Sequence, residues 1–248
     1  MKVSIVTVAF NAAATIRDTL ESVRTQRGVE IEHLVIDGGS KDATMAIVRE
    51  YPVRAVSEPD RGLYDAMNKG VRMATGDIVG ILNADDVFDG PDAVAKMAAG
   101  FDASVDAVYG DICFVRELGG KVVRYCSGRF FRKWMFRFGA FPAHPSTFIR
   151  REFFARLGGY SLDYRICADF ELMLRYFVGA KLRTRYLPVC TTVMRTGGLS
   201  TRGFRSTLQI NREDLRALKS NGVWSCLPLM YLRYFVKIWG VVFARFHH

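Results

Sequence analysis

The chain has 248 residues, of which half are hydrophobic, 12% aromatic and 24% charged. This composition excludes intrinsic disorder and collagen-like repeats, and the length favours one large domain over two small ones. The net charge of +10 is uneven, because residues 1–110 carry 11 Lys and Arg against 17 Asp and Glu, whereas residues 111–248 carry 24 against 8. The acidic first half argues against a nucleic-acid binder, and the basic second half indicates contact with phosphates or an anionic membrane surface.

The cysteines and the first residues both indicate a cytoplasmic protein. The five cysteines are scattered, odd in number and without a CxxC pair, which predicts reduced thiols. The opening run Lys2–Val8 reads as a strand, and its single Lys and its interrupting Ser4 and Thr7 do not fit a secretory signal peptide.

Short apolar runs alternate with helix-period segments over the first hundred residues. The apolar runs predict strands at Val3–Ala9, Ile31–Ile36, Val53–Val56 and Ile78–Leu82. The segments between them predict helices after Asn11, after Ser40, over Gly62–Ala74 and after Pro91. This alternation indicates βαβ units and a largely parallel sheet, in which ligands bind at the carboxyl ends of the strands. Polar clusters follow three of these strands, at Thr7 to Asn11, Asp37 to Ser40 and Asn83 to Asp86.

The second half is predicted to hold a hairpin, two further strands and three helical segments. The hairpin is Ala107–Val115 with Lys121–Cys126, the strands are Lys181–Leu187 and Val189–Met194, and the helices are Ala168–Phe177, Ser206–Lys219 and the very apolar Trp224–Phe246. Because this last stretch contains three cations, it favours a helix that lies in a membrane interface over one that spans the bilayer. The aromatic and basic stretch of residues 129–138 is either core filler with snorkelling cations or a patch facing the membrane and acceptor.

Four features are candidates for chemistry. The adjacent Asp85 and Asp86 follow a buried strand, where they either bind Mg²⁺ or Mn²⁺ or cap a helix. Asp37 accepts hydrogen bonds from a nucleotide or tightens its own turn. Asp169 opens a helix and is either a general base or a residue favoured by the helix dipole, and His144 binds an acceptor or is structural.

Five motifs in order resemble an inverting glycosyltransferase of family 2, in its polysaccharide and O-antigen branch. They are Val3–Asn11 as the first strand, Val35–Thr44 as the nucleotide turn, Ser57–Gly70, Asn83–Asp86 at the position of the DXD motif, and Ala168–Leu172 at the position of the catalytic base. The match covers residues 1–200. It implies an α/β GT-A fold, a Rossmann-like mixed sheet flanked by helices, with a C-terminal amphipathic segment that associates with membranes.

The resemblance also implies roles for individual residues. Asp169 would deprotonate the acceptor hydroxyl, Asp85 and Asp86 would hold Mg²⁺ or Mn²⁺, and His144 would contact the acceptor. A nucleotide-diphosphate sugar, with a UDP-sugar favoured, would be bound by Thr7, Ala9, Asn11, Asp37, Arg61, Asp65, Asn68 and Asp85. Residues 1–110 would form the donor half and 111–200 the acceptor half of the catalytic domain, with residues 201–248 as the membrane-associating region.

The partners implied are a lipid-linked saccharide acceptor and an anionic membrane surface, at the inner face of the cell membrane, and no nucleic acid. The chain departs from the family pattern at Gly38, where many relatives have a second Asp, and at Ala168, where a Glu is usual. Two alternatives stay open. One is a nucleotidyltransferase, and the other is a catalytically degenerate scaffold docked on a membrane.

Overall fold

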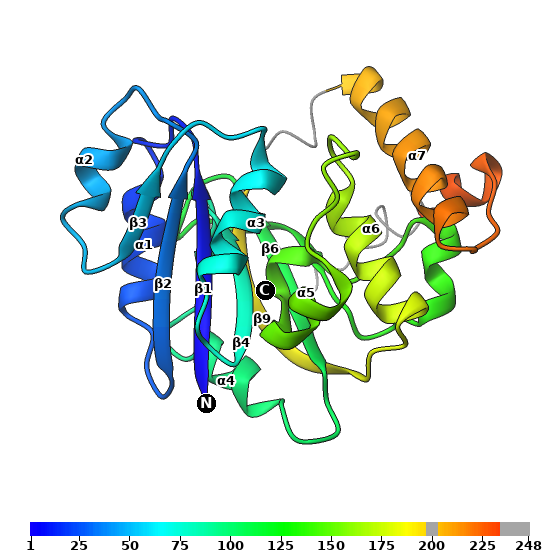
Figure 1. The fold of residues 1–248 in the computed structure, drawn as a ribbon, viewed down its shortest axis with the longest axis horizontal. Helices are drawn as coiled ribbons and strands as arrows, with labels where there is room; N and C mark the ends of the chain where they lie inside the picture. Colours follow the sequence, from blue (N-terminus) through cyan, green and yellow to red (C-terminus); the bar gives the residue numbers. More distant parts are fainter. Residues whose placement is uncertain (197–202, 234–248) are drawn as a thin grey trace.

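The computed structural model describes residues 1–196 and 203–233. Its centre is a nine-stranded mixed sheet with the order β3-β2-β1-β4-β8-β6-β9-β5, and β7 pairs with β6 outside this path. Helices cover both faces, so the predicted mixed sheet flanked by helices is confirmed (Figure 1). In the described ranges no helix has the length and apolar character needed to cross a bilayer.

The first half folds as the sequence predicts. The strands β3, β2, β1 and β4 lie side by side and are all parallel. Their bounds, with those of the intervening helices, are β1 Lys2–Ala9, α1 Ile16–Arg24, β2 Glu30–Asp37, α2 Thr44–Val48, β3 Arg54–Ser57, α3 Leu63–Met73 and β4 Ile78–Asn83. Because these strands are parallel, their carboxyl ends lie along one edge of the sheet.

The second half is antiparallel at its junction with the first. The short strand β8 (Thr147–Arg150) pairs antiparallel with both β4 and β6 (Ala107–Val115), and β6 forms the predicted hairpin with β7 (Val122–Cys126). The remaining elements are β5 Val87–Phe88, α4 Ala93–Ala99, the 3₁₀ helices η1 Lys133–Phe138 and η2 His144–Ser146, α5 Arg151–Leu157, α6 Ala168–Leu174, the π-helical turn η3 Arg175–Gly179, β9 Thr184–Arg195 and α7 Gly203–Ser220.

The prediction of two strands between residues 181 and 194 was wrong. The segment forms one strand, β9, which runs parallel to β6 and shifts its register between Tyr109 and Asp111. The shift skips Pro188, which lacks the N–H that a regular ladder needs, so the proline interrupts the pairing without ending the strand. The predicted Trp224–Phe246 helix starts later than expected: residues 224–226 are not helical, residues 227–233 are helical, and residues 234–246 lie outside the described residues.

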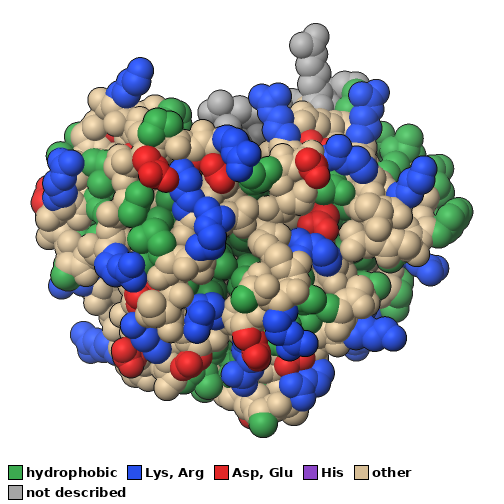
Figure 2. All heavy atoms as spheres, viewed as in Figure 1, with side chains coloured by type: hydrophobic (Ala, Val, Ile, Leu, Met, Phe, Trp, Pro, Cys, Tyr) green, Lys and Arg blue, Asp and Glu red, His purple; other side chains and the backbone are tan. Residues whose placement is uncertain are grey.

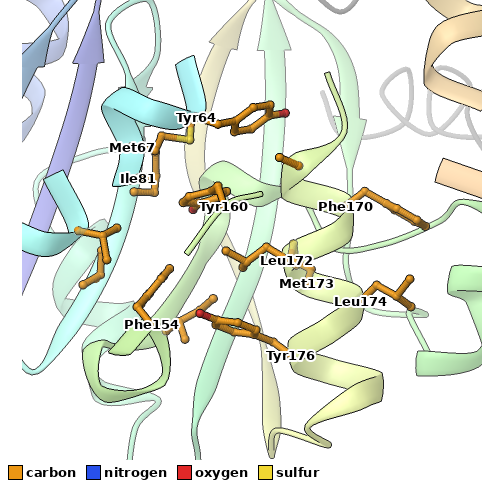
Figure 3. Packing of buried hydrophobic residues seen from close by; sticks show 14 of the residues in the cluster. Tyr64, Met67, Ile81, Phe154, Tyr160, Phe170, Leu172, Met173, Leu174 and Tyr176 are labelled. Carbon is orange, nitrogen blue, oxygen red and sulfur yellow. The ribbon is translucent and has the colours of Figure 1, made fainter. Parts of the chain in front are cut away.

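Helix α3 lies very close to the sheet. A Cβ atom at Gly70 would stand 2.2 Å from the Cγ1 atom of Val6, so only glycine permits this approach. On its other side, Met67 of α3 belongs to one hydrophobic cluster with Phe154 of α5 and Leu172 of α6 (Figure 3). The donor and acceptor halves of the predicted site are therefore joined through a continuous core.

Candidate active site

Strand register brings the three polar clusters to one edge of the sheet. Ala9 pairs with Asp37 across β1 and β2, and Val8 pairs with Asn83 across β1 and β4. The loops that follow the three strands are consequently neighbours, as the sequence predicts for a ligand site.

The carboxylate of Asp37 is fully buried and organises the turn that follows β2. It accepts hydrogen bonds from the Ser40 N–H at 2.9 Å, the Gly39 N–H at 3.2 Å and the Ser57 hydroxyl at 2.6 Å, and a further one from the Ser40 hydroxyl. In this arrangement Asp37 fixes the loop through its side chain, and the loop backbone forms the surface of the site.

The loop after β1 is tied to this same turn. Asn11 has a left-handed backbone with a φ of 49°, its N–H donates to the Ser40 hydroxyl at 2.7 Å, and its Oδ1 accepts the Lys41 N–H at 3.0 Å. These bonds hold Phe10, which sequence reasoning missed, with 65% of its surface exposed beside Asn11. An aromatic residue directly after the first strand of a parallel sheet was the signal that could have found it.

The two strand residues predicted to line the nucleotide pocket lie deeper. Thr7 is completely buried and its hydroxyl is hydrogen-bonded with His33 Nε2 at 3.0 Å, so its side chain does not reach the edge of the sheet. Ala9 is 6% exposed and ends β1. The part of β1 that faces a ligand is therefore its end, from Ala9 onward.

The pair Asp85 and Asp86 follows β4, and the second of them is almost completely buried. Burial, together with the neighbouring charge of Asp85, raises the pKa of Asp86 to about 8. The amide nitrogen of Asn83 donates to Asp86 Oδ2 at 3.1 Å, whereas among the described residues the buried Asn83 Oδ1 has no donor. The guanidinium of Arg195 donates to the Asp85 carbonyl at 2.8 Å and ion-pairs with Asp18, which closes this loop from the β9 side.

These oxygens fit a divalent cation. Two carboxylates and an unpartnered amide oxygen are hard ligands of the kind that Mg²⁺ and Mn²⁺ select. In residues 1–196 and 203–233 no group of three or more His, Cys, Asp or Glu gathers as a complete metal site. A cation held here would keep open positions, as Mg²⁺ does when it also binds substrate phosphates.

The segment before and within α3 contributes one exposed cation and two anchored side chains. Asp65 accepts the Arg61 N–H at 3.1 Å, which helps to lower its pKa, while the Arg61 side chain remains largely exposed. Asn68 uses both ends of its amide on the Tyr160 backbone, donating to the carbonyl and accepting the N–H at 2.8 Å each. Arg61 is thus available to a ligand, whereas Asn68 clamps α3 to the turn before Tyr160.

The acceptor-side candidates converge around two tyrosines. The Tyr64 hydroxyl donates its proton to the Ile166 carbonyl and lies 3.3 Å from Asp169 Oδ1, and Tyr64 stacks on Tyr160 with 5.8 Å between ring centroids (Figure 3). The hydroxyl of Tyr160 is 2.7 Å from His144 Nε2. The structure therefore brings Asp169 and His144, which are 25 residues apart in sequence, into one cluster with α3.

The titration of this cluster suits a proton acceptor. Burial raises the pKa of Asp169, an effect opposed by His144 and by the N–H of Phe170, and burial lowers the pKa of His144. Asp169 nevertheless keeps some exposed surface. A carboxylate that is reachable and more basic than usual is the kind of group that accepts a proton in general base catalysis.

Sequence reasoning missed Glu213 of α7, which holds the loop in front of Asp169. Its carboxylate accepts the backbone N–H groups of Arg165, Ile166 and Cys167 at 3.2, 2.9 and 3.0 Å. Arg165 and Ile166 lie in the loop before α6 and Cys167 is the N-cap residue of that helix, so Glu213 fixes the entry to α6 from a distant part of the chain. No local signal could have found it, because the partners are 46 to 48 residues apart.

Comparison with known proteins agrees with this geometry. The family model described as Glycosyl transferase family 2 matches residues 4–158. A PGL/p-HBAD biosynthesis glycosyltransferase of Mycobacterium bovis is 33% identical over 98% of this chain and 92% of its own length. An uncharacterized glycosyltransferase of Mycobacterium tuberculosis is 38% identical over 70% of this chain and 68% of its own length.

Solved structures share the fold at low sequence identity. A mannosyltransferase from Pyrobaculum calidifontis, in complex with GDP-Man and Mn²⁺, has a TM-score of 0.64 and 21% identity, over 98% of this chain and 72% of that one. Glucosyl-3-phosphoglycerate synthase from Mycobacterium tuberculosis, in complex with Mn²⁺, UDP and phosphoglyceric acid, has a TM-score of 0.63 and 19% identity, over 90% of this chain and 80% of that one. S. aureus TarS has a TM-score of 0.65 and 17% identity, and this chain spans 40% of its length.

The mixed sheet and its flanking helices have the GT-A architecture of these solved structures. The chain belongs to glycosyl transferase family 2, and it is a glycosyltransferase. The family and the fold predicted from the five motifs are thereby confirmed.

Proposed function

We propose that the protein is an inverting glycosyltransferase that moves a sugar from a nucleotide-diphosphate sugar, favouring UDP, to a hydroxyl of a saccharide acceptor. The observation that carries this proposal is the pairing of two different acidic sites. One is Asp85 and Asp86 beside the unpartnered Asn83 oxygen, and the other is the single basic carboxylate Asp169 in its aromatic cluster. A single-displacement transfer needs a site for the diphosphate and one base for the nucleophile.

The donor would lie across the strand ends. The loops that follow β1 and β2, held by Asp37 and Asn11, would bind the nucleotide, with Phe10 offering a flat face to the base. Arg61 and Asp65 would lie near the diphosphate or the sugar, and Asn68 would support them by fixing α3.

Asp86 and Asp85, with Asn83 Oδ1, would hold Mg²⁺ or Mn²⁺, and Asp85 would also contact the ribose. The cation supplies a Lewis acid that stabilises charge on the departing diphosphate. Thr7 and Ala9 would act by shaping the end of β1 and not through their side chains.

Asp169 would take the proton of the acceptor hydroxyl as the oxygen bonds to the anomeric carbon. The bond from that carbon to the diphosphate oxygen breaks in the same step, so the configuration inverts. Tyr64, whose hydroxyl lies 3.3 Å from Asp169 Oδ1, would line the site beside the base, and His144 would contact the acceptor.

We further propose a lipid-linked saccharide acceptor and a cytoplasmic enzyme at the inner face of the cell membrane. The basic second half supports this location, and the relative from Mycobacterium bovis is named for PGL/p-HBAD biosynthesis. In this scheme residues 1–110 form the donor half, 111–200 the acceptor half and 201–248 the region that contacts the membrane.

A nucleotide screen tests the donor site. UDP, GDP, dTDP and CDP are added to the protein with Mn²⁺, Mg²⁺ or a chelator, and the melting temperature is measured. We expect one nucleotide to stabilise the protein only when the metal is present, and Asp86→Ala to lose this effect. Asp92→Ala is the matched control, because Asp92 is an exposed acid paired with Lys96 on α4, and it should respond as the wild type does.

Three outcomes would contradict the proposal. Stabilisation by every nucleotide without metal would remove the role of Asp85 and Asp86. No binding of any nucleotide would favour the scaffold. A product that carries a nucleoside phosphate in place of a sugar would identify a nucleotidyltransferase.

A further inference from the structure

Two segments that the sequence offers as alternative membrane contacts pack against each other. The Ser225 hydroxyl donates to the Arg137 carbonyl at 2.5 Å, which joins the segment after α7 to η1. A Cβ atom at Gly139 would stand 2.7 Å from Met230 and 2.5 Å from Arg233, so the backbone at the end of η1 lies directly on the residues 227–233 helix. The two segments therefore form one surface.

This surface collects the exposed apolar side chains of the protein. The described residues expose ten large hydrophobic side chains, and six of them lie on these two segments, so their clustering is not a general feature of the molecule. The six are Phe130, Trp134, Trp224, Leu227, Tyr231 and Leu232, with exposed fractions from 44% to 73%. Together with the nearby cations Arg129, Arg132, Arg137 and Lys219, these six side chains are called the aromatic–basic surface. This surface lies beside α7, at the edge of the molecule away from β3 (Figures 1 and 2).

The charged side chains within the two segments have one sign. The sequence has no Asp or Glu in residues 122–151 or in residues 215–233. Arg129, Arg132 and Arg137 are exposed on the first segment, and Lys219 is exposed at the end of α7. An apolar groove of about 490 Å³, lined by Leu215, Lys219, Val223 and Trp224 among others, opens beside these cations.

We propose that the aromatic–basic surface docks on an anionic phospholipid bilayer. Tryptophan and tyrosine favour the membrane interface, where their rings are buried and their polar atoms stay hydrated, and arginine and lysine beside them attract anionic headgroups. A second copy of the chain is a poorer occupant, because a symmetric contact would place cations against cations without a carboxylate to compensate them.

The surface is built rigidly into the catalytic domain. Arg233 is buried and pairs with Asp214 of α7 at 2.5 Å, and Met230 lies in the same core cluster as Phe136. The residue before Asp214 is Glu213, which holds the loop leading into α6, the helix that carries Asp169. A bilayer bound at this surface would therefore be held at a fixed position relative to the proposed base.

This inference deepens the proposed membrane location and rests on it, but it does not depend on which donor or acceptor is used. Deleting residues 224–248 would not test it, because the deletion also removes Met230 and Arg233 from the core. Point variants on exposed side chains leave that core intact.

The experiment measures cosedimentation of the full chain with vesicles. One set is made of phosphatidylcholine and the other of phosphatidylcholine with phosphatidylglycerol. The variants are Phe130→Ser with Trp134→Ser on one segment, and Trp224→Ser with Leu227→Ser on the other. The control is Leu162→Ser, which removes an exposed leucine, 40% against 47% for Leu227, that stands next to Asp163 in a loop before α6.

We expect the wild type and the control to bind the anionic vesicles and to bind the neutral ones weakly. Each double variant should lower the binding constant at least about tenfold, because each removes two side chains from the same interface. Equal loss from both segments supports a single surface. Unchanged binding of either double variant, or equal binding to neutral vesicles, would overturn the proposal.

Two further measurements separate this proposal from others. The double variants should keep the melting temperature and the metal-dependent nucleotide binding of the wild type. A failure of the proposed function would therefore show in the nucleotide screen, whereas a failure of the docking proposal would show in the vesicle assay. A concentration-dependent dimer that the double variants abolish, without vesicle binding by the wild type, would assign the surface to a second copy of the chain.

Discussion

Replacing Glu213 tests how the proposed base is held in place. The carboxylate accepts three backbone N–H groups in the loop that leads to Asp169, and the Glu213→Ala variant leaves all three without an acceptor. Hydrogen bonds to a charged group contribute about 1.5–3 kcal/mol each, but three bonds to one carboxylate do not add fully. We therefore expect the free energy of unfolding to fall by about 3–4 kcal/mol in Glu213→Ala, and by about half as much in Glu213→Gln, which keeps one acceptor oxygen.

The same substitution should lower kcat more than it changes the donor KM. The loop that Glu213 holds leads directly into α6, which carries Asp169, whereas the loops proposed to bind the nucleotide are held by Asp37 on a different part of the sheet. We expect kcat to fall at least about tenfold in Glu213→Ala, because small displacements of a catalytic group are costly, with part of the rate restored in Glu213→Gln. Glu152→Ala, which removes an exposed acid from α5, is the control.

Acid should reduce the stability difference between the wild type and Glu213→Gln. Burial alone would raise the pKa of Glu213, but the N–H groups of Ile166 and Cys167 and the amide of Gln209 outweigh it and lower the pKa. A lowered pKa gives stability that is present above the unfolded pKa, about 4.3, and is lost as the pH falls through the folded value. The free energy of unfolding is measured by urea unfolding with circular dichroism at neutral and acid pH, and kcat is measured at neutral pH. A Glu213 variant that loses stability without any change in kcat, or that changes neither, would refute the reasoning.

Three further substitutions test the site and the core. Asp169→Asn should lower kcat by about 10²–10⁴-fold while the donor still binds. In the wild type the rate should rise as the pH passes the raised pKa of Asp169, and this rise should be absent in the variant. A variant with wild-type turnover would exclude Asp169 as the base. Gly70→Ala should lower stability in thermal unfolding by about 1–3 kcal/mol, since its Cβ would overlap Val6, and an unchanged melting temperature would show that α3 can move away. Asn68→Ala should cost about 1–3 kcal/mol through two lost bonds to Tyr160, and a loss of nucleotide affinity alone, at full stability, would show a direct ligand contact instead.

The sequence was sufficient for the donor half because its determinants are local. The strand β1 and the turn after β2 are short, continuous patterns, and the parallel register then fixes that Ala9, Asp37 and Asn83 meet. What the sequence did not give was the direction of the side chains. Thr7 and Phe10 are both close to the end of β1, but only the packing of the sheet against α1 shows that the first is buried and the second exposed.

The acceptor half could be predicted only as isolated residues. Asp169 and His144 were singled out by type and position, yet the tyrosines that join them come from α3 and from the turn after α5, and α7 supplies the cap of Glu213. These contacts link residues that are tens to more than a hundred positions apart, and no periodicity in the sequence records them. The two aromatic segments illustrate the same limit, because they read as competing candidates until the fold joins them.

The joined surface also gives a physical reason for the uneven charge of the chain. The proposed donor site lies among acidic residues, so a divalent cation bound there would neutralise both the carboxylates and the diphosphate. The basic residues are concentrated instead around the aromatic side chains of η1 and the segment after α7, where no carboxylate competes with an anionic headgroup. If this division is right, raising the salt concentration should weaken vesicle binding of the wild type steeply, while metal-dependent binding of the nucleotide, which is held at close range in a partly buried site, should decline much less. A parallel decline of both would mean that the cations act as a general electrostatic field and not as a docking surface.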